Sequence, residues 1–301
     1  MAEKWNLNQM PMQSGKRFLI TGANSGLGYG TAKALAKSGA EVIMTARSLD
    51  KGNTALESIK REVPNAKLKL MMLDLADLNS VKGFVDKYED ELGAIDVLIN
   101  NAGVMLPQSR KTTQQGFELQ FGTNHLGHFA FTKYLLPFLE KATNPRVVTL
   151  SSLVAKMRPA KIYWDDMQWE RSYDDMAAYS QSKLANMMFG LELNDLLVNR
   201  GSNISSLLAH PGYTATNLQQ HMGLQGKIMN FLLAQNVEMG ILPTLRAATD
   251  PNAKSGEYYG PNRMNEWRGY PTISTPNDLA MEKLQRKRLW ERSEKLTGVR
   301  Y

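Results

Sequence analysis

The chain has 301 residues, of which 43% are hydrophobic and 22% are charged, with a formal net charge of +7. This composition is that of an ordinary globular protein, and the length suits one α/β domain. The absence of cysteine excludes disulfides and thiolate metal sites and is consistent with a reducing compartment. No apolar run approaches the ~18 residues of a membrane span, and the polar N-terminus has no hydrophobic signal region. We therefore expect a cytoplasmic protein with no transmembrane segment.

Short apolar runs alternate with longer helical patterns along most of the chain. Six runs are predicted as strands, at 17–21, 41–46, 68–73, 96–100, 146–152 and 203–210. Helical patterns lie between them at 27–38, 51–62, 79–92 and 124–141, and a further helix precedes the sixth run. Because the runs are apolar throughout rather than alternating, we expect strands buried on both faces of a parallel sheet. The sequence therefore predicts an α/β fold over 1–301, a single three-layer domain with a doubly wound parallel sheet of the Rossmann type.

Two segments, 153–178 and 213–250, are longer and less regular than the other connections. Both are rich in methionine and aromatic residues. Long irregular segments in compact domains are often functional, so we predict that these two form a lid over a substrate. The alternative is that their side chains complete the core. Methionine adapts to varied apolar ligands, so the lid favours a lipophilic alcohol, aldehyde or ketone.

The C-terminal segment 281–301 carries much of the positive charge. Its seven cations are interspersed with three glutamates; the cations are Lys283, Arg286, Lys287, Arg288, Arg292, Lys295 and Arg300. Mixed charge of this kind is typical of a solvated helix. We expect a basic C-terminal helix there and no nucleic-acid partner, with an anion-binding surface as the alternative.

A glycine-rich turn follows the first predicted strand. The stretch TGANSGLGYG places Gly22, Gly26 and Gly28 between that strand and the next helix. Glycines at such a turn let the backbone approach a pyrophosphate, to which the helix N-terminus offers N–H donors. The spacing does not match the general dinucleotide fingerprint literally, so a simple tight turn is the alternative.

The end of the second strand indicates which nicotinamide cofactor the chain prefers. An acidic residue about 20 positions beyond the glycines would bond the ribose 2′-hydroxyl of NAD. Here the strand ends in Thr45, Ala46 and Arg47, and Glu41 lies at its opposite end. Arg47 offers a bidentate donor to a 2′-phosphate, which predicts NADP(H); the alternative is a solvated surface arginine.

Polar residues also follow the later strands. Asp74 ends the third strand, Asn101 and Gly103 follow the fourth, and Ser151 and Ser152 follow the fifth. Each could be an ordinary turn residue. Because ligands of such sheets bind beyond the carboxyl ends of the strands, the recurrence indicates a site at that edge.

The stretch AYSQSKLAN at 178–186 places Tyr179 four positions before Lys183, on one face of a helix. A free tyrosine titrates near 10 and is a poor base at neutral pH, but a nearby ammonium favours the phenolate. We therefore expect Lys183 to lower the pKa of Tyr179. Taken alone, the stretch could also be an ordinary face of an amphipathic helix.

Taken in order, these motifs resemble those of the short-chain dehydrogenase/reductase family. The set TGANSGLG, NNAG, NHLGHF, SS, YSQSK and HPG extends over about residues 16–217. The turn is similar to the family's common short form, in which the middle glycine is Gly26. The long separation of Ser152 from Tyr179 resembles the insertion of the retinol dehydrogenase-like branch. Many members of that branch carry a membrane anchor, which we do not expect here.

The resemblance implies a role for each residue. Tyr179 would exchange a proton with the substrate oxygen, and Lys183 would bond the nicotinamide ribose. Ser152, rather than Ser151, would polarise the carbonyl, and Asn124 would position Lys183. The other cofactor-binding residues would be Gly22, Ser25, Gly26, Leu27 and Gly28 at the pyrophosphate, Arg47 at the 2′-phosphate, Asp74 and Leu75 at the adenine, Asn101 and Gly103 beside the adenosine side, and Pro211, Gly212, Thr214 and Thr216 at the nicotinamide end.

The resemblance implies an NADP(H)-dependent oxidoreductase acting on CH–OH, of the carbonyl reductase or alcohol dehydrogenase type. The alternative is a non-catalytic NADP(H)-binding regulatory protein, which the presence of all four catalytic-type residues disfavours. We expect no metal, because the four histidines match no metal motif and cysteine is absent. Many members of the family pair through the helices after the fourth and fifth strands, which leaves a homodimer open.

Overall fold

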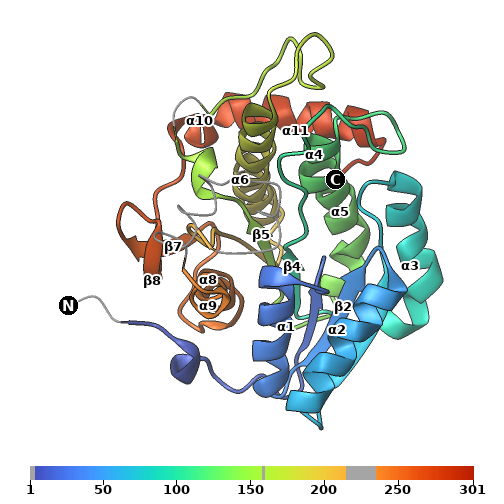
Figure 1. The fold of residues 1–301 in the computed structure, drawn as a ribbon, viewed down its shortest axis with the longest axis vertical. Helices are drawn as coiled ribbons and strands as arrows, with labels where there is room; N and C mark the ends of the chain where they lie inside the picture. The colour runs from blue at the N-terminus through green and yellow to red at the C-terminus, as the bar shows by residue number, and fades with distance from the viewer. Residues whose placement is uncertain (1–3, 158–159, 215–234) are drawn as a thin grey trace.

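One mixed sheet of eight strands forms the centre of the computed structural model, which describes residues 4–157, 160–214 and 235–301 (Figure 1). The strand order is β3-β2-β1-β4-β5-β6-β7-β8, and every neighbouring pair is parallel except β7 with β8. The six predicted strands are β1 Arg17–Ile20, β2 Glu41–Ala46, β3 Lys67–Met72, β4 Val97–Asn100, β5 Arg146–Leu150 and β6 Ser205–Ala209. The chain order reverses between β1 and β4, and this switch point opens a crevice beyond the carboxyl ends of the strands. The predicted Rossmann-type fold is confirmed.

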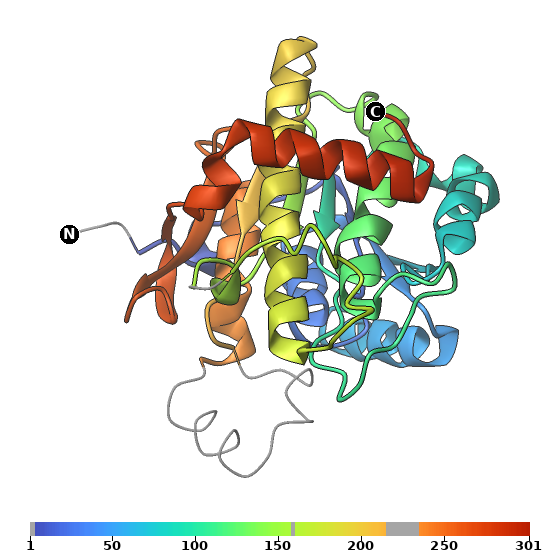
Figure 2. The ribbon, with the colours of Figure 1, turned by 90° about the horizontal axis from the view of Figure 1, so that it is seen from above.

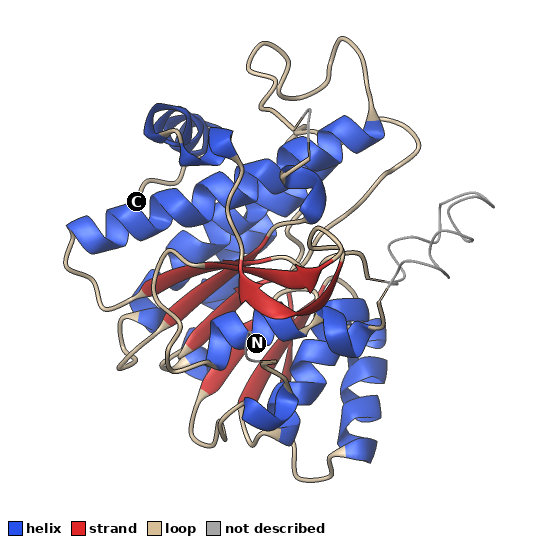
Figure 3. Ribbon diagram, turned by 90° about the vertical axis from the view of Figure 1, so that its left-hand side faces the viewer, coloured by secondary structure: helices blue, strands red, loops and turns tan. Residues whose placement is uncertain are grey.

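Helices cover both faces of the sheet (Figure 3). One face packs on α1 (Gly26–Lys37), α2 (Leu49–Glu62) and α9 (Leu242–Thr249). The other face packs on α3 (Leu78–Leu92), α5 (Gly127–Leu139) and α6 (Asp175–Asn199). Successive strand residues enter opposite layers: Leu19 packs with α3 and α5, whereas Phe18 and Ile20 pack with α1. Burial on both faces is why the strands are apolar throughout.

Short elements connect these layers. They are η1 (Leu7–Gln9), α4 (Leu119–Phe121), η2 (Gly122–Leu126), η3 (Leu153–Ala155), α8 (Val237–Gly240) and α10 (Asp278–Met281). The helix expected over 124–141 thus begins as a π turn, η2, before it becomes α5. Among the described residues, no helix has the length and apolarity that crossing a membrane requires. The cytoplasmic location stays a prediction.

The sheet ends in a hairpin that the sequence did not predict. Strand β7 (Tyr258–Arg263) pairs with β6, and β8 (Arg268–Ile273) returns antiparallel along the sheet edge. Pro261 lies opposite Pro271 in this pair. Proline is tolerated on an edge strand because the N–H groups on the outer side of that strand have no partner strand to bond. In a sequence, however, a proline within an apolar run argues against a strand, so this hairpin was not predicted.

The predicted basic C-terminal helix is α11 (Lys283–Thr297), which lies across α6 (Figure 2). One of its faces is not solvated as expected, because Arg286, Leu289 and Trp290 are buried. The Trp290 ring stacks on Phe189 of α6, with ring centroids 5.8 Å apart. The homodimer stays a prediction. Because α11 lies on α6, a dimer interface built from α5 and α6 would have to include α11 or lie beside it.

Part of the first predicted lid segment is fixed to α6. Met167 and Trp169 are buried, and the Gln181 side chain donates to Met167 O at 2.9 Å. Met157 and Met176, near the two ends of the segment, are exposed. In the second segment, 215–234 lies outside the described residues, as does the predicted cofactor residue Thr216. The role of both segments as a lid stays a prediction.

Candidate active site

The glycine turn after β1 forms a cradle of bare backbone. Gly22 and Gly26 have φ of 64° and 56°, a region that favours glycine. A Cβ on Gly28 would lie only 2.4 Å from Gly22 O, so a larger residue would not fit there. The Ser25 side chain makes no capping hydrogen bond at the start of α1. The first N–H groups of α1 are therefore open to an anion such as a pyrophosphate.

The cradle is fastened to the end of β4. Thr21 Oγ1 accepts the backbone N–H groups of Asn101 and Ala102, both at 2.9 Å. The Asn101 side chain donates to Thr21 O at 2.7 Å and to Gly22 O at 3.3 Å. Asn101 thus shapes the glycine turn directly, and its predicted place at the adenosine side stays a prediction.

The ends of β2 and β3 lie beside this turn in the sheet. Arg47 follows β2 and is exposed, and the next residue, Ser48, caps α2. Asp74 is half-buried, with Oδ1 accepting Ala76 N–H at 2.9 Å, while Leu75 is buried. At the opposite end of β2, Glu41 forms an ion pair with Arg17 at 2.9 Å. Glu41 therefore lies far from the crevice, as predicted.

Asn124 lies in the π turn η2, a distortion that is frequent at functional sites. Its side chain is buried, with Oδ1 accepting Val104 N–H at 2.7 Å and Nδ2 donating to Val104 O at 2.9 Å. A Cβ on Gly103 would lie 3.2 Å from Asn124 Oδ1 and 3.4 Å from Lys183 Nζ. Asn124 and Lys183 therefore border the same small space, which Gly103 keeps open.

The two serines after β5 differ in their contacts. Ser151 is buried, and its hydroxyl donates to Lys183 O at 2.7 Å. Ser152 is half-buried, and its side chain lies close enough to Tyr179 to lower the pKa of that phenol. Ser151 therefore ties β5 to α6, whereas Ser152 lies with Tyr179 in the site.

The expectation that Lys183 lowers the pKa of Tyr179 is wrong for this arrangement. Burial raises the pKa of Tyr179 to about 12, and only the neighbouring Ser152 side chain opposes that rise. The Lys183 ammonium lies 5.9 Å from the centre of the phenol ring. The prediction overlooked desolvation, which penalises a phenolate in a site that leaves Tyr179 only 9% exposed.

Lys183 is itself strongly desolvated. Its side chain is buried, and Nζ donates to Leu150 O at 3.4 Å. Burial lowers its pKa from 10.5 to about 8. The amine is therefore still mostly protonated at neutral pH, but it titrates within the working range of an enzyme.

The buried histidines of the NHLGHF stretch support the fold around the site. His125 Nε2 lies 2.8 Å from Ser293 Oγ, and His128 Nε2 lies 2.8 Å from Thr21 Oγ1. Burial lowers the pKa of His125 to about 3 and that of His128 to about 4, so both rings are neutral. Within the described residues, no cluster of His, Asp and Glu is suited to hold a metal ion.

A loop after β6 closes the other end of the site. Pro211 O accepts the Thr214 hydroxyl at 2.8 Å and the Gln235 side chain at 2.7 Å. Gly212 has a φ of 66°, and a Cβ there would lie 2.5 Å from Trp267 O. The sequence predicted Pro211, Gly212 and Thr214 here, but it gave no signal for Gln235 or for the contact with the β7–β8 hairpin.

The comparisons with known proteins agree with this geometry. A family model described as short chain dehydrogenase matches residues 16–164. Human retinol dehydrogenase 13 is 36% identical over 95% of this chain and 85% of its own length. Human polyprenol dehydrogenase is 36% identical over 93% of this chain and 84% of its own length. A crystal structure of an uncharacterised protein from Mycobacterium paratuberculosis is 37% identical, covers 99% of both chains and has a TM-score of 0.83. The chain therefore belongs to the short-chain dehydrogenase/reductase family, in its retinol dehydrogenase-like branch, and is an oxidoreductase.

Proposed function

We propose that the protein is an NADP(H)-dependent oxidoreductase that interconverts a lipophilic carbonyl compound and its alcohol, with Tyr179 as the proton-transferring group. The observation that carries this proposal is the convergence of four side chains at the carboxyl edge of the sheet. They are Asn124, Ser152, Tyr179 and Lys183, held together by the contacts given above. A non-catalytic NADP(H)-binding protein would not need all four.

The residues at the strand ends fit a dinucleotide. The glycine turn has no Cβ where a pyrophosphate would lie, and the start of α1 has free N–H donors. Arg47 is exposed at the end of β2, where no acid is present to bond a ribose 2′-hydroxyl. Its guanidinium could therefore pair with a 2′-phosphate, which favours NADP(H) over NAD(H).

A bound nicotinamide would supply or accept the hydride, and the chain's own residues would handle the oxygen of the substrate. Ser152 would donate a hydrogen bond to that oxygen, and Tyr179 would transfer the proton. Lys183, protonated below a pKa of about 8, would hold positive charge beside the phenol as it loses its proton. Asn124 fixes the backbone at Val104 and so shapes the wall beside Lys183.

The protonation state of Tyr179 favours one direction. A phenol with a pKa of about 12 is neutral at pH 7 and is ready to donate a proton. Donation to the oxygen is the step that carbonyl reduction requires, whereas alcohol oxidation needs the phenolate as a base. We therefore propose that reduction by NADPH is the faster direction at neutral pH.

The substrate class rests on apolar side chains near the site and on the names of two relatives. Met157 lies beyond η3 and Met176 one turn before Tyr179, and both are exposed. The relatives cited above are named for retinol and polyprenol, both lipophilic alcohols. We therefore propose that the substrate is a lipophilic aldehyde or ketone.

The test is a screen of lipophilic aldehydes and ketones that follows NADPH consumption, with Tyr179→Phe assayed in parallel. Because a positioned general acid contributes about 10²–10⁴-fold, Tyr179→Phe should lose at least about a hundredfold in turnover. Its affinity for NADPH, measured by fluorescence titration, should stay near that of the wild type. Substantial turnover by Tyr179→Phe on an identified substrate would refute the role of the phenol.

A further inference from the structure

The tip of the β7–β8 hairpin has an unusual backbone. Met264, Asn265 and Glu266 are consecutive, none is glycine, and their φ values are 52°, 50° and 67°. Non-glycine residues in this region are strained and persist where the surrounding structure holds them. At Glu266 the holding contacts come from its side chain, which points inward and is only 25% exposed.

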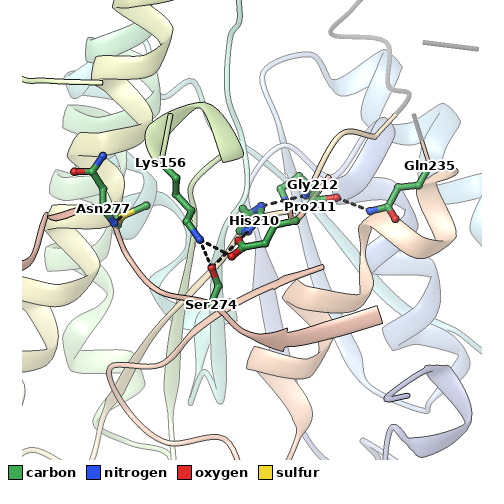
Figure 4. A network of polar contacts seen from close by, with 9 residues as sticks. Lys156, His210, Pro211, Gly212, Gln235, Ser274 and Asn277 are labelled. Atoms are coloured by element: carbon green, nitrogen blue, oxygen red, sulfur yellow. Dashed lines mark hydrogen bonds and ion pairs between the residues drawn. The ribbon is translucent and has the colours of Figure 1, made fainter. Parts of the chain in front are cut away.

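The Glu266 carboxylate is bonded by three separate segments of the chain. His210 Nε2 donates to Oε2 at 2.7 Å, and the Ser274 hydroxyl donates to the same oxygen at 2.7 Å. Lys156 Nζ donates to Oε1 at 2.6 Å and also to Ser274 Oγ at 2.7 Å. Figure 4 shows Lys156, His210 and Ser274 converging on one point. Although burial raises the pKa of Glu266, these hydrogen bonds lower it to about 2, so the carboxylate is charged at neutral pH.

Through His210, the carboxylate determines the shape of the loop at the nicotinamide end. Gly212 N–H donates to His210 Nδ1 at 3.3 Å, so the ring hydrogen must lie on Nε2, which faces Glu266. The residue after Glu266 bonds the same loop, since Tyr213 N–H donates to Trp267 O at 2.8 Å. Glu266 therefore fixes both the orientation and the tautomer of the ring that holds Gly212.

Through Lys156, the carboxylate also holds the segment that follows Ser152. Lys156 comes directly after η3, which starts one residue beyond Ser152. Two further bonds fasten this segment: Ser180 Oγ donates to Val154 O at 3.1 Å, and the Asn277 side chain donates to Ala155 O at 2.9 Å. Of these contacts, only the one through Lys156 continues to the loop after β6.

We propose that Glu266 is a positioning residue that joins the Ser152 segment to the Pro211–Gly212 loop, and so sets the separation between the substrate-polarising hydroxyl and the nicotinamide ring. This inference rests on the proposed function, in which the two segments hold the two reactants. Hydride transfer needs both reactants in close register, and a shift of about 1 Å can cost about a hundredfold in rate. In this proposal the effect of Glu266 passes through its contacts with Lys156 and His210.

The kinetic test is Glu266→Gln, which keeps the size of the side chain but removes its charge and one acceptor. We expect kcat at saturating NADPH to fall about tenfold to a hundredfold, while the Kd of NADPH changes little. The primary isotope effect with NADPH deuterated at the transferred hydrogen should increase, because hydride transfer becomes more nearly rate-limiting. Glu89→Gln, the same change at an exposed position of α3, is the control and should leave all three quantities unchanged.

The linkage itself can be tested with a second variant. Lys156→Met breaks one side of the network and leaves His210 and Ser274 on Glu266. If the two residues act as one unit, the double variant Lys156→Met/Glu266→Gln should be no slower than Glu266→Gln alone. Rate losses that simply multiply would overturn the proposal, as would an unchanged kcat and isotope effect in a folded Glu266→Gln.

A measurement without cofactor separates this proposal from the proposed function. Amide hydrogen exchange should become at least about tenfold faster at both Gly212 and Ala155 in Glu266→Gln, with global melting little changed. Faster exchange at only one of the two sites would show that Glu266 does not join them. This readout needs no turnover, whereas a wild type that fails to oxidise NADPH with any carbonyl would count against the proposed function alone.

Discussion

Two buried cations lie at α6, one in the helix itself and one packed on it from α11, and their partners differ. Among the described residues, the one hydrogen-bond acceptor of Lys183 Nζ is Leu150 O, and burial lowers the pKa of Lys183 to about 8. Arg286, which reaches α6 from α11, is paired with Glu192 at 3.0 Å and with Asp195. Both side chains are 5% exposed, so burial alone does not explain the difference.

Under the proposed function, Lys183 is a cation used in the reaction, whereas Arg286 is a cation that holds two helices together. A buried charge without a partner of opposite sign destabilises the fold, but its proton can be gained and lost near neutral pH. A buried charge with two carboxylates stays ionised and fastens one helix to another. Among the residues that the structure describes, no carboxylate forms an ion pair with Lys183, which is the arrangement that a proton-transfer site needs.

Removing the first cation should give the largest effect. Lys183→Met is expected to lose at least about a hundredfold in turnover, because the phenol loses the neighbouring charge. The same change should stabilise the fold by about 1–3 kcal/mol at pH 7, since the desolvation cost of the ammonium disappears. Steady-state kinetics and thermal melting check the two halves. A lower melting temperature for Lys183→Met would contradict the assignment of an unpaired, destabilising charge.

The pH dependence of that stability follows from the sign of the pKa shift. The pKa of Lys183 is about 8 in the folded chain and its usual 10.5 in the unfolded chain. Between these values the unfolded state binds more protons, so the wild type gains stability as the pH rises. The advantage of Lys183→Met should therefore be complete below pH 8 and shrink toward pH 10. Melting curves of both proteins over this range provide the measurement.

Removing the second cation should have the opposite sign. Arg286→Met leaves Glu192 and Asp195 without a cation on the surface of α6, and breaking such a pair costs about 3–5 kcal/mol when it is fully buried. The two acids are 21% and 36% exposed, so we expect a loss of about 2–3 kcal/mol. Chemical denaturation measures it. Lys287→Met, at the next and exposed position, is the control and should change stability little. A stability loss in both variants would show that the ion pairs are not the cause.

The sequence predicted the first six strands and the side chains at their ends, for a physical reason. Strands buried on both faces must be apolar throughout, and a turn at a pyrophosphate must use residues such as Gly22 and Gly28, whose backbone is bare. Strands β7 and β8 escaped prediction because Pro261 and Pro271 interrupt their pattern at a sheet edge. Their pairing is fixed by tertiary packing rather than by local preference.

A residue that affects the site only through contacts with distant residues has no recognisable motif around it in the sequence. Glu266 bonds Lys156, which is 110 positions away, and nothing in its neighbours marks it as more than an exposed glutamate in a turn. The pKa shift of Tyr179 was predicted in the wrong direction, because a sequence shows the spacing of residues but not their burial. Likewise, the charge pattern of 281–301 concealed that Arg286 and Trp290 are buried.

The exposed cation Arg47 completes the comparison and should give the smallest effect. Arg47 forms no ion pair with any residue that the structure describes, so Arg47→Ala should leave the melting temperature unchanged. We expect wild-type protein to bind NADPH at least about tenfold tighter than NADH, because a charge-assisted pair with the 2′-phosphate is worth about 1.5 kcal/mol or more. In Arg47→Ala the two affinities should converge, through weaker binding of NADPH rather than tighter binding of NADH. Arg61→Ala, an exposed arginine at the far end of α2, should keep the preference. Equal affinities already in the wild type would mean that Arg47 is a solvated surface residue, and that the missing acid at the end of β2 does not select the cofactor.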